Sequence, residues 1–222
     1  MCGIAGFIDN QYTGTKGKDL MGKVLQSIKH RGPDGSHIFQ EGAICLGHNR
    51  LSIIDLSHEA DQPMHGWGST IVFNGEIYNY LELKKALELD GYIFKTQSDT
   101  EVLLALYHKH GDQCVQYCAG MWAFAIWDGR RRELFCARDR LGVKPFYYTV
   151  VGGSFLFASE IKALRAHPDA GKRPNDLMLL AFLAWGAPEL GAHCVTIIPM
   201  CCAQYVCLSV VGKIVDGTRH LQ

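Results

Sequence analysis

Short, almost continuously apolar runs separated by glycine or polar residues are the dominant pattern along this chain of 222 residues. Runs of this length that are rich in β-branched and aromatic residues predict buried strands. They cover residues 4–8, 43–48, 70–74, 121–127, 133–138, 146–151 and 154–158. Gly129 and the pair Gly152-Gly153 supply turn residues between consecutive runs, so we expect these strands to pair antiparallel.

Helical periodicity predicts fewer elements, over residues 19–29, 81–89, 100–110, 160–166 and 176–185. The third follows a capping box, because Ser98 precedes Glu101 by three residues. Asp99 then falls in the first helical turn, where the helix dipole favours a carboxylate. Antiparallel strands with apolar helices outside them predict an α+β layered fold.

Composition excludes several classes of partner. Lysine plus arginine equals aspartate plus glutamate at 22 each, so no net field favours nucleic acid or an anionic membrane. Nine cysteines without a C-x-x-C pair, and no signal peptide at the start, predict a cytoplasmic protein with reduced thiols. Cys114 and Cys118 could share a helical face with His108 or His110, but the spacing of a four-ligand zinc site is absent, so no metal site is predicted.

One stretch, residues 190–212, has no formal charge and is long enough to span a bilayer. Pro199 and Gln204 interrupt it, and β-branched residues dominate its middle. Two buried strands joined near Pro199 therefore explain it better than a membrane helix.

Cys2 is the first candidate for chemistry. Removal of Met1 would place a thiol and a free α-amine on one residue, with ordinary pKa values of about 8.5 and about 7.7. Such a pair can exchange a proton near neutral pH, which makes Cys2 a nucleophile with its own base. The alternative is that Cys2 is a small buried residue of the first strand.

Other polar segments each allow two interpretations. Arg50 ends an apolar strand and is either a surface cation or a fork for a substrate carboxylate. Asn74-Gly75 is either a hairpin turn or an oxyanion hole built from an amide and a glycine N–H. Residues 30–35 (HRGPDG) contain a Pro-Asp-Gly turn, although a plain turn would not need the adjoining His and Arg. The charges of residues 138–148 could belong merely to a solvated loop.

Taken together, these segments resemble the glutaminase domain of glutamine-dependent asparagine synthetase, a class II glutamine amidotransferase and N-terminal-nucleophile hydrolase. The resemblance rests on Cys2-Gly3-Ile4 and on residues 30–35, 50–55, 74–79, 98–101 and 139–148, and it extends more loosely beyond Lys162. It implies a four-layer αββα sandwich with two antiparallel sheets, spanning residues 2–222. Pro33-Asp34-Gly35 resembles the asparagine synthetase branch of the class.

The resemblance also implies a site. Cys2 would attack glutamine to form a glutamyl thioester, its α-amine would relay protons, and Asn74 and Gly75 would stabilise the oxyanion. Arg50 would bind the substrate α-carboxylate, and Glu76 with Asp99 its α-ammonium. Main-chain groups would line the pocket at Leu51, Ser52, Ile53 and Ile54. No metal or organic cofactor is expected for this half reaction.

Ammonia released by such a domain would pass to an ATP-dependent synthetase domain that converts aspartate to asparagine. The Ser-Gly-Gly-x-Asp-Ser loop of that domain does not occur in these 222 residues, so ATP and magnesium would belong to a partner domain in cis or in trans. A homodimer is compatible with the family.

Two alternatives to this function are a non-catalytic glutamine-sensing or docking module and an amidotransferase domain that serves a different acceptor. Near Pro199 the sequence Met200-Cys201-Cys202 departs from the family pattern.

Overall fold

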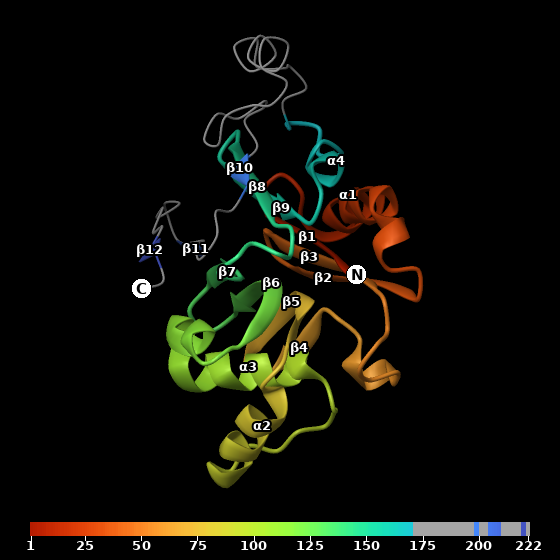
Figure 1. Cartoon of the computed structure of the whole chain (residues 1–222). Helices are drawn as coiled ribbons and strands as arrows, with labels where there is room; N and C mark the ends of the chain where they lie inside the picture. Colours follow the sequence, from red (N-terminus) through yellow and green to blue (C-terminus); the bar gives the residue numbers. More distant parts are fainter. Residues whose placement is uncertain (171–197, 200–203, 210–218, 221–222) are drawn as a thin grey trace, which may run out of the picture.

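The computed structural model describes residues 1–170, 198–199, 204–209 and 219–220, and two six-stranded sheets organise them (Figure 1). The first sheet has the order β10-β8-β9-β1-β3-β2 and the second β12-β11-β7-β6-β5-β4, and every pair is antiparallel. The strands are β1 (Gly3–Ile8), β2 (Gly35–Glu41), β3 (Ile44–Arg50), β4 (Met64–Gly66), β5 (Ser69–Ile77), β6 (Gly120–Asp128), β7 (Glu133–Arg138), β8 (Tyr147–Val151), β9 (Ser154–Ala158), β10 (Ile198–Pro199), β11 (Gln204–Ser209) and β12 (Arg219–His220).

Helices cover the outer face of each sheet, as Figure 1 shows. Helices α1 (Gly14–Ser27) and α4 (Ile161–Leu164) pack on the first sheet, and α2 (Tyr80–Leu89) and α3 (Asp99–His110) lie on the side of the second. A third apolar core fills the space between the sheets. The predicted α+β fold, a four-layer αββα sandwich, is therefore confirmed.

Strand periodicity decides which polar side chains enter the space between the sheets. Alternate side chains of a strand point to opposite faces. The apolar side chains that β1, β3 and β5 send into the inter-sheet core are Ile4, Leu46 and Val72. Counting by twos from them reaches Cys2, Arg50 and Asn74, so the same faces that build the core carry these three residues to its open end.

Asn74 and Gly75 lie within a strand, and the predicted strand end at Asn74 is wrong. β5 continues to Ile77, with Asn74 paired to Ala123 and Gly75 to Trp122. A Cβ on residue 75 would lie 2.5 Å from the carbonyl oxygen of Met121. The glycine thus permits close approach of β6 rather than a turn.

The edge strands β2, β4 and β12 have no counterpart among the predicted strands, and the predicted helix over residues 176–185 lies outside the described residues. The two strands expected to join near Pro199 belong to different sheets, because β10 pairs with β8 and β11 with β7. Among the described residues no helix is long and apolar enough to cross a membrane.

The start of α3 is capped, but not by the reciprocal pair that the sequence predicts. The Ser98 hydroxyl accepts a hydrogen bond from the Thr100 N–H at 3.1 Å. The Glu101 carboxylate accepts from the N–H groups of Lys95 and Thr96, at 3.0 and 2.7 Å, instead of reaching the Ser98 N–H. Glu101 therefore fixes the chain that leads into the helix.

Candidate active site

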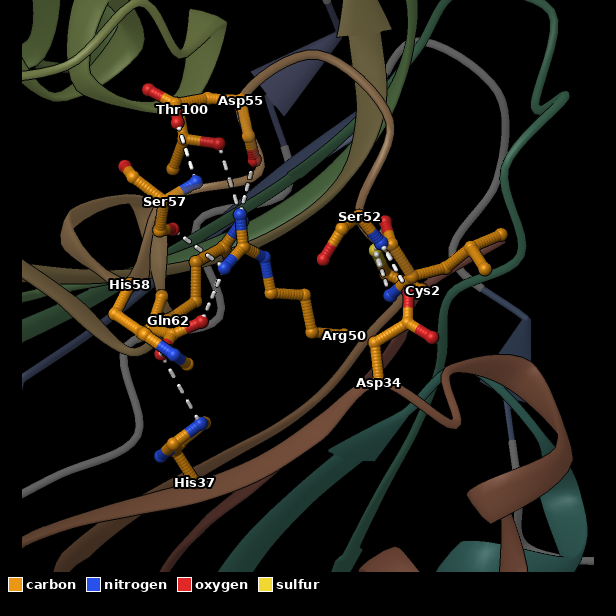
Figure 2. Close-up of polar contacts among 12 residues, drawn as sticks. Cys2, Asp34, His37, Arg50, Ser52, Asp55, Ser57, His58, Gln62 and Thr100 are labelled. Carbon is orange, nitrogen blue, oxygen red and sulfur yellow. Dashed lines mark hydrogen bonds and ion pairs between the residues drawn. The ribbon is translucent and has the colours of Figure 1, made fainter.

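A single pocket at the end of the inter-sheet core brings the predicted site residues together. All of them line it, from β1, β3, β5, α3 and the loop after β3: Cys2, Arg50, Leu51, Ser52, Ile53, Ile54, Asn74, Gly75, Glu76 and Asp99. Figure 2 shows the side of this pocket formed by Cys2, Arg50 and the loop that follows Arg50. The exposed side chains of Ile53 and Ile54 agree with a main-chain rather than a side-chain role in the pocket wall.

The Cys2 sulfur lies against the backbone of Leu51. The Leu51 N–H donates to Sγ at 3.4 Å, and Sγ lies 3.6 Å from the Leu51 carbonyl oxygen, to which it donates. The Arg31 Nε–H donates to the Cys2 carbonyl at 3.0 Å and fixes the residue from the other side. Burial raises the pKa of the Cys2 thiol, so attack requires a base to take its proton. Met1 lines the same pocket and is 55% exposed, so its removal would uncover an amine on Cys2.

Two hydrogen-bond donors on β5 face the pocket. The Asn74 side chain is buried, and its Nδ2 has no hydrogen-bond partner among the described residues. The N–H groups of Phe73 and Ile77 point away from β6, because they donate to Gln62 Oε1 and Asp99 Oδ2. Backbone N–H groups alternate in direction along a strand, so the Gly75 N–H points to the same open edge. A buried donor without an acceptor is costly, and an oxyanion would supply the missing acceptor.

Asp99 and Glu76 make the opposite wall negative. The Asp99 carboxylate is 4% exposed and accepts a hydrogen bond from the Ile77 N–H at 3.1 Å. Burial, and to a smaller extent the charge of Glu76, raises the pKa of Asp99 from 3.8 to about 6. A carboxylate whose charged form is destabilised by burial can bind a cation of the ligand, since ion pairing would return its pKa towards the ordinary value.

Arg50 supplies positive charge to the pocket, which Lys144 also lines. Its guanidinium is 8% exposed and forms an ion pair with Asp61 at 2.5 Å. Burial lowers the pKa of His48, two residues earlier on the same face of β3, to about 3, so this imidazole is neutral. The pocket therefore has a cationic side at Arg50 and an anionic side at Asp99, which is the charge pattern of an α-amino acid in reverse.

Comparison with known proteins shows the family of this chain. The model of the glutamine amidotransferase domain family matches residues 1–202. The chain belongs to the glutamine amidotransferase domain family. A relative named asparagine synthetase [glutamine-hydrolyzing] 3 from Bacillus subtilis (strain 168) is 46% identical over 177 residues, which cover 78% of this chain and 29% of the relative. A putative asparagine synthetase [glutamine-hydrolyzing] 2 from Methanocaldococcus jannaschii is 44% identical over 196 residues and is covered to 37%.

The chain thus spans about a third of the length of these two relatives. Among solved structures, glutamine phosphoribosylpyrophosphate amidotransferase from B. subtilis, complexed with ADP and GMP, superimposes with a TM-score of 0.71 at 21% identity. The match covers 99% of this chain and 49% of that one. At this identity the likeness supports the fold of the amidotransferase domain.

The structure also shows the contacts of residues 30–35, for which local preference alone predicts a turn. Residues 30–35 contact Cys2 and the loop after β3: Arg31 Nη1 donates to Glu160 at 3.1 Å, while its Nε–H donates to the Cys2 carbonyl. The Asp34 carboxylate accepts from the Ser52 N–H at 2.8 Å (Figure 2). The charged residues within a Pro-Gly turn were a visible sign of such a role, but their partners come from distant segments. Gln62, which holds the Phe73 N–H, carried no comparable sign.

Proposed function

We propose that this domain hydrolyses glutamine to glutamate and ammonia through a thioester on Cys2. The observation that carries the proposal is the buried Asn74 Nδ2, which has no hydrogen-bond partner in the described part of the chain and lines the same pocket as Cys2. Family membership supports the class of reaction, and this buried donor supports Asn74 as the group that would stabilise the oxyanion.

The reaction follows from the chemistry of each group. After loss of Met1, the α-amine of Cys2 takes the thiol proton, and the sulfur attacks the side-chain amide carbon of glutamine. The carbonyl oxygen becomes an oxyanion that accepts hydrogen bonds from Asn74 Nδ2 and the Gly75 N–H. The amine then returns its proton to the leaving nitrogen, which departs as ammonia. Water attacks the thioester, releases glutamate and restores the thiol.

Substrate recognition would use the two charged sides of the pocket. Arg50 binds the α-carboxylate, since its planar fork matches a carboxylate, and Asp99 with Glu76 binds the α-ammonium. The backbone of residues 51–54 closes the pocket wall between them. Neither half of this reaction requires a metal or an organic cofactor.

The ammonia would serve a synthetase domain, in cis or in trans, that uses ATP and magnesium to convert aspartate to asparagine in the cytoplasm. The names of the two relatives above support this acceptor. A different acceptor is the second candidate, because another relative, 38% identical over 178 residues, is named amidase chyE from Penicillium rubens.

Ammonia release by the purified chain tests the proposal. We expect glutamine-dependent ammonia from the unaltered chain, none from Cys2→Ala, and an unchanged rate from Cys118→Ala. Cys118 is a matched control because it lies in the core beside α3, where Sγ donates to the Cys114 carbonyl at 3.4 Å. Glutamine binding without ammonia release by the unaltered chain would contradict the proposal and favour a glutamine-sensing module.

A further inference from the structure

The loop of residues 51–61 folds back over the guanidinium of Arg50 (Figure 2). Arg50 Nη1 donates to the Ser57 carbonyl at 2.8 Å and to Asp61 Oδ1 at 2.5 Å. Arg50 Nη2 donates to the Asp55 carbonyl. The residue that the proposed function assigns to substrate is therefore first held by its own loop.

Counting donors shows what this arrangement leaves for a ligand. An arginine side chain has five N–H donors in a rigid plane. Three of them are used by Asp55, Ser57 and Asp61, so the Nε–H and one Nη2–H donate no hydrogen bond to the described residues. These two nitrogens form one edge of the guanidinium, and such an edge binds a carboxylate through two parallel hydrogen bonds.

Asp61 differs from the other two partners because it is a charged side chain that bridges several groups. While Oδ1 binds Arg50, Oδ2 faces His58 Nδ1 at 3.1 Å and His37 Nε2 at 3.5 Å. His37 belongs to β2, the neighbour of β3 in the first sheet. Asp61 is therefore anchored on both sides, to the end of β3 and to the edge strand beside it.

We propose that Asp61 is a positioning residue for substrate recognition. It clamps one end of the Arg50 guanidinium, so that the edge made by Nε and Nη2 stays turned to the pocket and meets the α-carboxylate of glutamine. This inference rests on the proposed function. Asp61 is the only ion-pair partner of this guanidinium among the described residues, whereas the Asp55 and Ser57 carbonyls are neutral acceptors.

The other contacts of the loop support a separate role for Asp61 at its end. Its start is tied by the Ser52 N–H to Asp34 at 2.8 Å, and its middle by Asp55, whose carboxylate accepts from the Gln97 N–H at 3.0 Å. Asp61 ties its end to Arg50. Loss of this contact would free the clamped end of the guanidinium while the first two ties hold the remainder of the loop in place.

A different role makes the opposite prediction. If the charge of Asp61 mattered more than its position, the carboxylate would compete with the substrate carboxylate for Arg50, and its removal would tighten glutamine binding. Asp61→Asn removes the charge but keeps an acceptor oxygen for Nη1, whereas Asp61→Ala removes both. The two variants therefore separate position from charge.

The experiment measures steady-state ammonia release by the full chain and these variants, with glutamine and with 4-aminobutanamide, which is glutamine without its α-carboxylate. For Asp61→Ala we expect KM for glutamine to rise about tenfold or more with kcat within about twofold, because the lost interaction acts on binding. Asp61→Asn should stay close to the unaltered chain. With 4-aminobutanamide all three proteins should have the same kcat/KM, which a general disturbance of the site would not give.

Asp90→Ala is the matched control, because Asp90 forms an ion pair of the same length, 2.5 Å, with Lys109 between α2 and α3. Asp90→Ala should leave kcat and KM unchanged for both substrates. If Asp61→Ala does not fold, Asp61→Glu, which displaces the carboxylate by one methylene, should show the same rise in KM. An unchanged or lower KM for glutamine in the folded variant overturns the inference alone. Absence of ammonia from the unaltered chain overturns the proposed function and, with it, the inference.

Discussion

Replacement of Asp99 by asparagine should raise the stability of the fold but weaken the binding of glutamine. Asp99 is buried, and its pKa is raised to about 6. If it binds the α-ammonium of glutamine, the ionised form is required. Binding should then weaken as the pH falls through about 6, while the α-ammonium itself stays charged.

The size of the effect follows from the raised pKa. With a pKa of about 6, roughly nine tenths of Asp99 is ionised at pH 7 and roughly one tenth at pH 5, so the Kd for glutamine should increase about tenfold between these values. The destabilisation of the fold by Asp99 should decrease as the pH falls. An acid with a raised pKa binds its proton more tightly in the folded state, so it destabilises the fold above pH 6 and the cost disappears as the pH falls towards 3.8. A shift from 3.8 to about 6 corresponds to about 3 kcal/mol at neutral pH.

Calorimetric titration of glutamine into Cys2→Ala, which binds but cannot react, isolates binding from chemistry. We expect the Kd to rise about tenfold from pH 7 to pH 5 in this background. Addition of Asp99→Asn should weaken binding roughly 10- to 100-fold at pH 7 and remove the pH dependence. The same substitution should raise the melting temperature at pH 7.5, with a smaller gain at lower pH.

Asp128→Asn is the matched control, because Asp128 is as buried as Asp99 but lies at the far end of β6, where it accepts from the Arg130 and Arg131 N–H groups. It should leave the pH dependence of binding intact. A Kd for glutamine that does not change between pH 7 and pH 5, or a pH dependence that survives Asp99→Asn, would refute the assignment of Asp99 to the ammonium.

Three further substitutions test other residues that line the pocket. Asn74→Ala should lower kcat by about 10²- to 10³-fold with little change in KM, because the oxyanion exists only after attack; an equal rise in KM would point to substrate binding instead. Gly75→Ala should lower both the melting temperature and kcat, since its Cβ would lie 2.5 Å from the Met121 carbonyl oxygen, and full activity would show that β5 can shift without harm. Ser98→Ala should lower the free energy of unfolding by about 1 kcal/mol through loss of the bond from the Thr100 N–H, measured by urea denaturation, and an unchanged midpoint would exclude the cap as a stabilising contact.

The central strands could be predicted from the sequence because their apolar runs are independent of the partner strand. β7 and β9 begin and end where the pattern predicts. The edge strand β2 could not, because it is only partly buried and mixes polar with apolar residues. At Asn74-Gly75 local preference favours a turn, and pairing with β6 overrides it. Here the tertiary contact, not the local sequence, decides the conformation.

In the candidate site, too, some residues could be predicted from the sequence and some contacts could not. Cys2, Arg50 and Asn74 could be proposed from residue chemistry, and strand periodicity places them on one face. The clamp of Arg50 by Asp61 could not be predicted, because it depends on how a loop of irregular structure closes. Nor could the bond between Arg31 and the Cys2 carbonyl, which joins residues 29 positions apart. Such contacts are set by the packing of whole segments.

The central claim is that the Cys2 thiol, freed at its amine by loss of Met1, carries the glutamyl group. Intact-mass spectrometry of the purified chain, quenched in acid during turnover of glutamine, tests it directly. We expect Met1 to be absent and part of the protein to carry one glutamyl group, which hydroxylamine removes and which Cys2→Ala never acquires. Ammonia release by a chain that retains Met1, or turnover without any glutamyl adduct on Cys2, would contradict it.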